Sequence, residues 1–262
     1  MNSLLNPAHD LKPNQLPAAL CLIVSAKGST PRREGARMLV FANGSIEGSI
    51  GGGALEKQVI IDALITIKEK KPRLFRHDLL HHHGMCCGGS LQIYIEPIMA
   101  NPKLYLFGAG HTGHAIALRA AGCGFDTFVI DDRPEYTHQI QIPGVNILTL
   151  PFSQALQALP FDLHTYIAIL TYNHATDREI LFHCIQQPHA YIGMIGSQRK
   201  VELTKKLLLE SGIASIEQIN LVDMPMGMPI LAETPEEIAI SILAKLILIK
   251  NQSHTPPQNS LD

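Results

Sequence analysis

A glycine-rich turn between a predicted strand and a predicted helix constrains the fold of this chain more than any other feature. The apolar strand 104–107 leads into a G-x-G-x-x-G turn, and a helix is predicted over 111–121. The three glycines are Gly108, Gly110 and Gly113. In Rossmann folds such glycines permit, in turn, a tight bend, close approach of a pyrophosphate, and close helix–strand packing. The spacing therefore predicts a Rossmann-like domain.

Asp131 adds to this prediction, because it ends the next predicted strand, 125–131. In dinucleotide-binding folds a carboxylate at that place binds a ribose hydroxyl. The helix N-terminus supplies N–H groups and a positive dipole end for phosphate. We therefore expect NAD(P) or another nucleotide at the turn. The alternative is that the turn serves packing alone and binds no nucleotide.

The segments beyond this turn alternate between apolar strands and helices. Strands are predicted at 145–148, 166–171 and 190–194, and helices at 175–186, at 198–210 and from Thr234 onward. Near-continuous apolar strands separated by helices predict a parallel sheet covered on both faces. These segments define a Rossmann-like domain over 103–250, and we expect the tail, 251–262, to be disordered.

The first part of the chain is predicted to form a mixed α+β domain over residues 1–97. Strand patterns lie at 18–26, 37–42, 45–48, 73–78 and 91–96, and a helical pattern lies at 54–70. Pro97 and Pro102 bracket a segment without periodicity, so residues 98–102 are interpreted as a linker. The chain is thus predicted to be an α/β protein, with a C-terminal Rossmann-like parallel-sheet domain and a smaller N-terminal α+β domain.

Composition excludes several classes of partner. The formal net charge of the 262 residues is -2, so no basic excess exists to release counterions from nucleic acid, and no nucleic acid is expected as a partner. The C-terminal apolar stretch 238–249 is short and contains Lys245, which predicts a packed helix and no membrane association. The N-terminal sequence lacks the pattern of a signal peptide, and the 5 cysteines are scattered. A reducing, cytoplasmic location is expected.

The sequence Cys86-Cys87-Gly88-Gly89 is the second motif that indicates chemistry. Two thiols beside glycines, in a loop that enters a strand, are accessible and close to unpaired backbone N–H groups. Such surroundings favour thiolate, the species that binds soft metals or carries sulfur. Cys86 and Cys87 are therefore candidate metal ligands. The alternative is a polar loop with incidental cysteines; without a second cysteine pair, a structural zinc site is not indicated.

Three further loops are suited to an anion, and the first of them, residues 28–37, offers hydroxyls and guanidinium groups. Gly51, Gly52 and Gly53 precede the predicted helix 54–70. Ser197 and Arg199 follow the predicted strand 190–194, at the edge where open α/β sheets bind ligands. Backbone N–H groups, hydroxyls and guanidinium groups all bind phosphate. The alternative for each is an ordinary loop with a good helix cap.

Taken together, these motifs resemble the XdhC/CoxI family, the xanthine dehydrogenase accessory proteins. The N-terminal part of the resemblance rests on GSTPRREGARMLV, GSIGGGALE and CCGG. The C-terminal part rests on LYLFGAGHTGHAIA, VIDDRPEY, TYNHATDREIL, YIGMIGSQRK and AETPEEIAISILA. Two places depart from the family pattern: Met85 stands where glutamine is common, and the segment 224–231 lacks the expected glycines and isoleucines.

The resemblance implies that the protein is a chaperone for the molybdenum cofactor (molybdopterin) rather than an enzyme in its own right. Such a protein binds the cofactor, assists its sulfuration and delivers it to a xanthine dehydrogenase-type molybdoenzyme. The implied cofactor-binding residues are the glycine loop 51–53, the motif 86–89 and the turn 108–113. A cysteine desulfurase as a second partner, and a homodimer, are left open.

Two other functions remain open from the residues alone. One is an NAD(P)-dependent oxidoreductase, in which His174 and Asp177 act as acid and base, although capping of the helix by the segment 176–179 explains Asp177 equally well. The other is a nucleotide-sensing scaffold without catalysis. Hydride transfer with a small substrate would favour the first, and partner binding without cofactor would favour the second.

Overall fold

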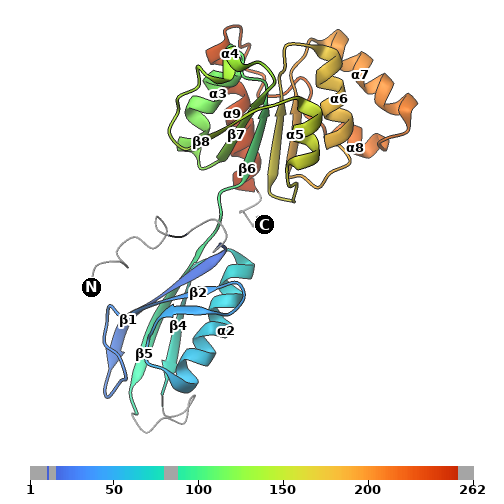
Figure 1. Cartoon of the computed structure of the whole chain (residues 1–262). Coiled ribbons are helices and arrows are strands. Elements are labelled where there is room, and N and C mark those ends of the chain that lie inside the picture. Colours follow the sequence, from blue (N-terminus) through green and yellow to red (C-terminus); the bar gives the residue numbers. More distant parts are fainter. Residues whose placement is uncertain (1–10, 12–15, 80–87, 253–262) are drawn as a thin grey trace. The chain divides into compact units, whose positions relative to one another are not determined.

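The computed structural model describes residue 11, residues 16–79 and residues 88–252. Contacts between residues divide the chain into two compact units, residues 1–100 and residues 101–262 (Figure 1). Each unit has its own sheet and its own hydrophobic core. The two units are therefore described separately.

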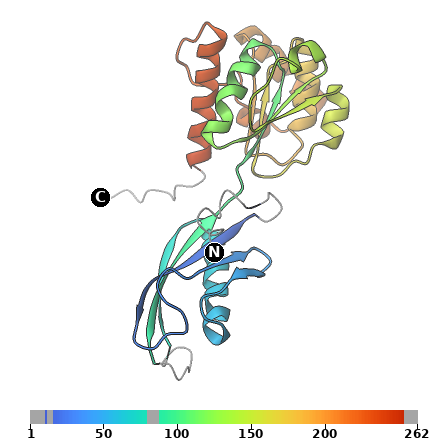
Figure 2. The same ribbon diagram turned by 60° about the vertical axis from the view of Figure 1, so that its left-hand side comes forward.

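The N-terminal unit is a five-stranded antiparallel sheet with one long helix. In the order β3-β2-β1-β5-β4, the strands are Ile46–Gly48, Arg37–Phe41, Ala18–Lys27, Ser90–Ile98 and Arg73–Asp78. Alternate residues of β5, such as Ile93 and Ile95, are buried, as expected when one face of a sheet covers the core. Helix α2 (Gly53–Glu69) packs Leu55 and Val59 into that core, along one face of the sheet (Figure 2). This confirms the predicted α+β unit.

The C-terminal unit is a five-stranded parallel sheet. In the order β10-β9-β6-β7-β8, the strands are Tyr191–Met194, Thr165–Ile169, Lys103–Phe107, Asp126–Asp131 and Val145–Thr149. The chain runs outward from β6 to β8 and then returns to the other side of β6 for β9 and β10. The carboxyl ends of β6 and β9 therefore flank a topological switch point, where open α/β sheets bind ligands.

Helices cover both faces of this parallel sheet, as predicted. On one face lie α3 (His111–Ala120) and α9 (Pro235–Gln252), which run side by side in both views (Figures 1 and 2). The other face is covered by α5 (Phe152–Ala158), α6 (His174–Cys184) and α7 (Gln198–Ser211). Alternate residues of β6 enter opposite cores, which explains why the strand reads as one apolar run.

The structure adds short helices that the sequence patterns did not predict. These are α4 (Pro134–Thr137), α5 and α8 (Ile216–Leu221), each too short to show a helical period. The predicted cap of α6 at 176–179 is wrong. Helix α6 begins at His174 and is capped by Asn173, whose side chain accepts a 2.8 Å hydrogen bond from the Ala175 amide. None of the helices in residues 16–79 and 88–252 is long and apolar enough to cross a membrane.

Candidate functional site

Two glycines of the G-x-G-x-x-G turn are required by packing. Gly108 has a φ of +123°, and a Cβ atom there would clash with the carbonyl oxygen of Leu170, just past β9. A Cβ atom at Gly113 would clash with the carbonyl oxygen of Gly108, so the helix could not lie so close to the strand. These contacts agree with the predicted packing roles of both residues.

The middle glycine of the turn is not required by packing. Gly110 caps α3 with a φ of -64°, which any residue can adopt, and a Cβ atom there would meet nothing within 4 Å. The space in front of Gly110 is therefore open, and the first-turn amides of α3 lack partners within the helix. Open space beside unpaired N–H groups suits the approach of a phosphate.

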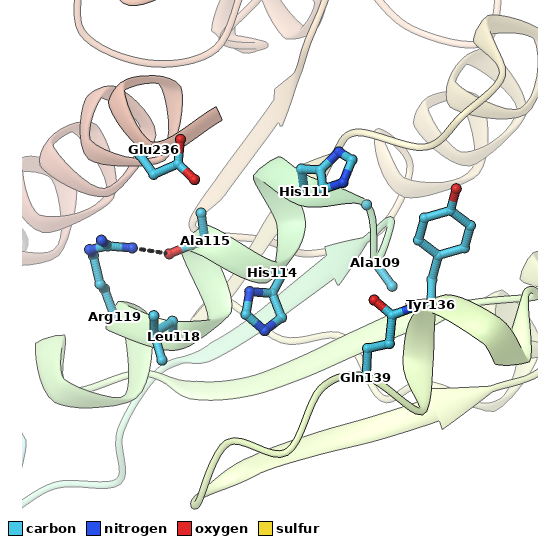
Figure 3. Close-up of a pocket in the computed structure, with 10 residues that line it drawn as sticks. Ala109, His111, His114, Ala115, Leu118, Arg119, Tyr136, Gln139 and Glu236 are labelled. Atoms are coloured by element: carbon cyan, nitrogen blue, oxygen red, sulfur yellow. Dashed lines mark hydrogen bonds between the residues drawn. The ribbon is translucent and has the colours of Figure 1, made fainter. Parts of the chain in front are cut away.

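A cavity of about 390 Å³ begins at this turn and follows α3 (Figure 3). Its lining combines backbone at the turn, side chains of α3 and side chains that reach over from α4, the loop after it, and α9. The lining residues are Ala109, Gly110, His111, His114, Ala115, Leu118, Arg119, Tyr136, Gln139 and Glu236. The volume lies in the range of small-molecule sites, and the mixed polar lining suits a nucleotide-sized ligand.

Asp131 anchors the turn to the end of β7. Its buried carboxylate accepts hydrogen bonds from the Ala109 amide at 2.7 Å and from the backbone and guanidinium of Arg133 at 2.8–3.0 Å. Burial alone would raise the pKa of Asp131, but the hydrogen bonds from Arg133 and Ala109 outweigh it and hold the pKa below its usual value. Both oxygens are engaged, so the predicted contact of Asp131 with a ribose would require Arg133 to move.

Arg133 is a residue of this region that sequence reasoning missed. Its guanidinium lies 4.0 Å from the ring centre of Tyr136 and 4.2 Å from that of Tyr172. Tyr172 belongs to the loop after β9, and its hydroxyl donates a 3.1 Å hydrogen bond to Asp132. This stack joins the loops that follow β7 and β9. An arginine two positions after Asp131 is visible in the sequence, but its two aromatic partners are not.

Ser197 and Arg199 lie at the N-terminus of α7, as predicted. Ser197 is the N-cap residue, although its side chain makes no capping hydrogen bond. Both residues are exposed, and both follow β10 at the carboxyl edge of the sheet. They are therefore accessible to a ligand, and their role in binding one stays a prediction.

In the N-terminal unit, the loop that includes Gly51 and Gly52 surrounds a carboxylate of the chain itself. One oxygen of Glu56 accepts hydrogen bonds from the Ser49 hydroxyl at 2.6 Å and from the amides of Ile50, Gly51 and Gly52 at 2.8–3.2 Å. Burial raises the pKa of Glu56, but these hydrogen bonds outweigh it and the pKa is lowered. Four donors that converge on one oxygen form an anion nest.

The backbone of this loop requires glycine. Gly51, Gly52 and Gly53 all have φ values between +66° and +140°, which other residues rarely adopt. A Cβ atom would meet nothing within 4 Å at Gly52 or at Gly53, so these two positions open toward free space. In this structure the loop donors bind Glu56 of the chain itself, so the binding of a ligand anion by Gly51, Gly52 and Gly53 stays a prediction.

The structure brings three sequence motifs of the N-terminal unit together around the segment 28–31. Gly88 pairs with Ser29 in an isolated β-bridge, and a Cβ atom at Gly89 would clash with the Ser29 carbonyl oxygen. On its other side, Pro31 is so close to Gly51 that a Cβ atom there would lie 2.5 Å from the proline ring. The glycines of the cysteine motif and the 51–53 loop therefore both contact the segment 28–31.

Cys86 and Cys87 lie outside the described residues, so their role as metal ligands stays a prediction. Within the described ranges, no group of three or more histidine, cysteine or acidic side chains is arranged to hold a metal ion. Of the remaining cysteines, Cys21 and Cys184 are buried and Cys123 is half-buried. Burial raises the pKa of Cys21 and of Cys184 to about 12, as expected for thiols that fill a core.

Comparison with known proteins connects both units to one family. Residues 104–246 match the family described as the XdhC Rossmann domain, and residues 12–78 match the XdhC and CoxI family. Escherichia coli (strain K12) YqeB, named as an uncharacterized protein, is 40% identical over 257 residues, which are 96% of this chain and 47% of YqeB. A Bacillus subtilis (strain 168) protein, named as a probable subunit of xanthine dehydrogenase, is 35% identical over 156 residues, which are 59% of this chain and 45% of that protein.

The chain therefore spans about half the length of these curated relatives. Among solved structures, a xanthine dehydrogenase of Bacillus halodurans is similar, with a TM-score of 0.52 and 22% identity. The similarity covers 93% of this chain and 94% of that one. At this level of identity it shows a shared fold alone.

Proposed function

This chain belongs to the XdhC and CoxI family, and we propose on that basis that it is a molybdenum cofactor-binding accessory protein of a xanthine dehydrogenase-type enzyme. In this role it acts as a chaperone that assists sulfuration of the cofactor and its insertion into the partner enzyme. The name of the Bacillus subtilis relative supports a partner of that type. We place this activity in the cytoplasm, with a cysteine desulfurase as the source of sulfur.

The anion nest around Glu56 is the observation that carries this proposal. Molybdenum cofactor is an anionic pterin with a phosphate group and a metal bound by a dithiolene. The residues present fit the phosphate, because the nest already binds one anionic oxygen through Ser49 and three backbone amides. A phosphate that displaced Glu56 would meet the same donors, and the amides of Gly51 and Gly52 would hold it.

The thiols of Cys86 and Cys87 are proposed to interact with the metal or its sulfur. Thiolate is the softest ligand among protein side chains, and the cofactor, when bound, supplies a soft metal centre. In the sequence the two cysteines directly precede Gly88, whose backbone pairs with Ser29. Ser29 belongs to the segment 28–31, which also contacts the 51–53 loop. The nest and the cysteine motif are therefore linked through this segment.

The turn at 108–113 is proposed as a second binding region of the same protein. The open space at Gly110 and the adjoining cavity support a phosphate-containing ligand there, either the pterin phosphate or a nucleotide such as NAD(P). In this proposal Gly108, Gly110 and Gly113 shape the turn, and Asp131 holds it in place.

Ligand analysis of the full chain tests this function. The protein is purified without oxygen from a host that makes the cofactor, and the bound ligand is identified by mass spectrometry and quantified per chain. The double variant Cys86→Ser/Cys87→Ser is expected to fold normally but to lose the cofactor and the ability to activate a xanthine dehydrogenase-type enzyme. The matched control is Cys123→Ser, which should retain both. Wild-type cofactor content and activation in the double variant would refute the thiol role.

A further inference from the structure

Three polar residues meet at the carboxyl edge of the parallel sheet, outside the cavity along α3. His174 and Asp177 belong to the first turn of α6, which follows β9. Lys200 belongs to the first turn of α7, which follows the neighbouring strand β10. Sequence reasoning paired His174 with Asp177, and the structure adds the lysine.

This cluster is next to the glycine turn. A Cβ atom at Gly108 would clash with the carbonyl oxygen of Leu170 and would lie 3.2 Å from the amide nitrogen of Thr171. The same amide donates a 2.8 Å hydrogen bond to Asp177, so one peptide group connects the turn with the cluster. In doubly wound sheets a bound dinucleotide extends across this switch point.

Asp177 orients the histidine. Its side chain is 1% exposed, and one oxygen accepts hydrogen bonds from the Thr171 amide and, at 2.7 Å, from the Thr171 hydroxyl. The other oxygen accepts no hydrogen bond in the described part of the chain and lies 3.2 Å from Nδ1 of His174. At this distance an aligned Nδ1–H group would donate a hydrogen bond to it. Burial raises the pKa of Asp177 in spite of the hydrogen bonds from Thr171 and the charge of His174, so this carboxylate gains from a cationic neighbour.

The opposite nitrogen of His174 faces a cation. With the proton on Nδ1, Nε2 is the acceptor of the ring, and Lys200 Nζ contacts it. The histidine side chain is 44% exposed, so a small molecule can reach this point. Because Nζ contacts Nε2 directly, the exposed side chain of Lys200 would have to swing aside before a substrate oxygen could lie between the two nitrogens and reach both. Ser197, the N-cap of α7, leaves its hydroxyl unused for capping, beside a helix end that favours negative charge.

We propose that His174, Asp177 and Lys200 form a proton-transfer site that acts on a small anionic alcohol, or on the matching carbonyl compound, with a nicotinamide dinucleotide bound at Gly108–Gly113. His174 is the catalytic base, Asp177 is a positioning residue, and Lys200 binds the reacting oxygen. The inference rests on the nucleotide-binding part of the proposed function and is independent of the cysteine motif.

The step balances as an oxidation by the nicotinamide. The C–H bond of the alcohol breaks, and an oxidised nicotinamide bound at the turn would take up the hydride as the two-electron acceptor. The O–H bond of the same alcohol breaks, its proton moves to Nε2 of His174, and its electron pair forms the C=O bond. The imidazolium, stabilised by Asp177, then releases the proton to water. In the reverse direction the imidazolium returns the proton to the carbonyl oxygen, to which Lys200 donates a hydrogen bond, and a bound reduced nicotinamide would supply the hydride.

Two measurements on the full chain test this proposal. The first is dinucleotide binding, followed by calorimetry with NAD⁺ and NADP⁺. The second is turnover of glycolate, lactate, glycerate and malate with the dinucleotide that binds, followed by nicotinamide absorbance. Oxalate, which carries the same carboxylate without a reactive hydrogen, is titrated into the dinucleotide complex as a binding probe.

We expect turnover of at least one of these hydroxy acids by the wild type. His174→Gln should reduce kcat by roughly 10²–10⁴-fold and leave dinucleotide affinity unchanged. Asp177→Asn should reduce kcat with little change in KM, and Lys200→Met should weaken oxalate binding. The matched control is Lys206→Met, at an exposed position of the same helix, which should behave as wild type.

Each contrary result is decisive. If a dinucleotide binds but neither turnover nor oxalate binding depends on His174 and Lys200, the proton-transfer site is refuted while the proposed nucleotide site stands. If no dinucleotide binds, both this inference and the nucleotide part of the proposed function fail, whereas cofactor binding in the N-terminal unit is judged separately by ligand analysis.

Discussion

Replacement of Glu56 by glutamine tests whether the nest of the N-terminal unit is a ligand site or only a helix cap. The Glu56→Gln variant keeps the shape of the side chain and removes its charge. One oxygen of Glu56 accepts four hydrogen bonds from Ser49 and the amides of Ile50, Gly51 and Gly52. Hydrogen bonds to a charged group are roughly twice as strong as neutral ones. Because the carboxylate is only half-buried, we expect a loss of about 1–2 kcal/mol in the free energy of unfolding.

The same free energy sets the expected gain in phosphate affinity. A phosphate that enters the nest must first displace the carboxylate, and the variant removes most of that competition. A change of about 1–2 kcal/mol corresponds to roughly 5–30-fold tighter binding, since 1.4 kcal/mol is a factor of ten. The variant should therefore be less stable alone and more strongly stabilised by inorganic phosphate than the wild type.

The dependence on pH gives a second measure of the same carboxylate. The pKa of Glu56 is lower in the folded state than its ordinary value, so its contribution to stability is fully present above the unfolded-state value of about 4.3. That contribution is lost as the pH falls through the folded-state pKa. Urea unfolding across this acidic range should show a smaller loss of stability in Glu56→Gln than in the wild type.

Phosphate titration with calorimetry and with urea unfolding is the assay. Glu47→Gln, an exposed carboxylate on β3 outside the nest, is the matched control for the change in charge. It should alter neither stability nor phosphate affinity appreciably. If Glu56→Gln loses stability but binds phosphate no more tightly than Glu47→Gln, the nest serves only to cap α2, and the reasoning is wrong.

Two further predictions concern the turn of the C-terminal unit. Gly110→Asn should fold, because asparagine caps helices well and the position is open. The variant should nevertheless weaken nucleotide or pterin-phosphate binding at least tenfold in calorimetry. Gly122→Asn, at another open glycine, is the control, and equal affinities of the two variants would mean that the turn serves packing alone. Asp131→Asn should lower the free energy of unfolding in urea by about 3 kcal/mol, because a buried charge pair and the anchor of Ala109 are lost. The folded state holds the pKa of Asp131 below its ordinary value, so the difference between wild type and variant should be full above the unfolded-state pKa of about 3.9 and should shrink as the pH falls through the folded-state pKa. A loss below about 1 kcal/mol would contradict the anchoring role.

The sequence by itself determined the strands, helices and turns that depend only on residues close together in the chain. The parallel sheet followed from apolar runs separated by helices, because a strand buried on both faces has no polar side. The roles of Gly108 and Gly113 followed from a turn geometry that only glycine permits, and the structure agrees with both. Short helices such as α4 escaped prediction because four residues make barely one helical turn.

The tertiary structure alone decided which partner each polar group takes. Asp131 was predicted to face a ribose, but it is engaged by Arg133 and by Ala109, which is 22 positions away along the chain. Glu56 turns back into a nest that the sequence offered to a ligand, and Lys200 contacts His174 across two helices. Periodicity reports which side of an element is apolar, whereas a hydrogen bond depends on atoms that only packing brings within about 3 Å. For that reason the sequence determined the sheets, and the packing of the loops at their edges determined the sites.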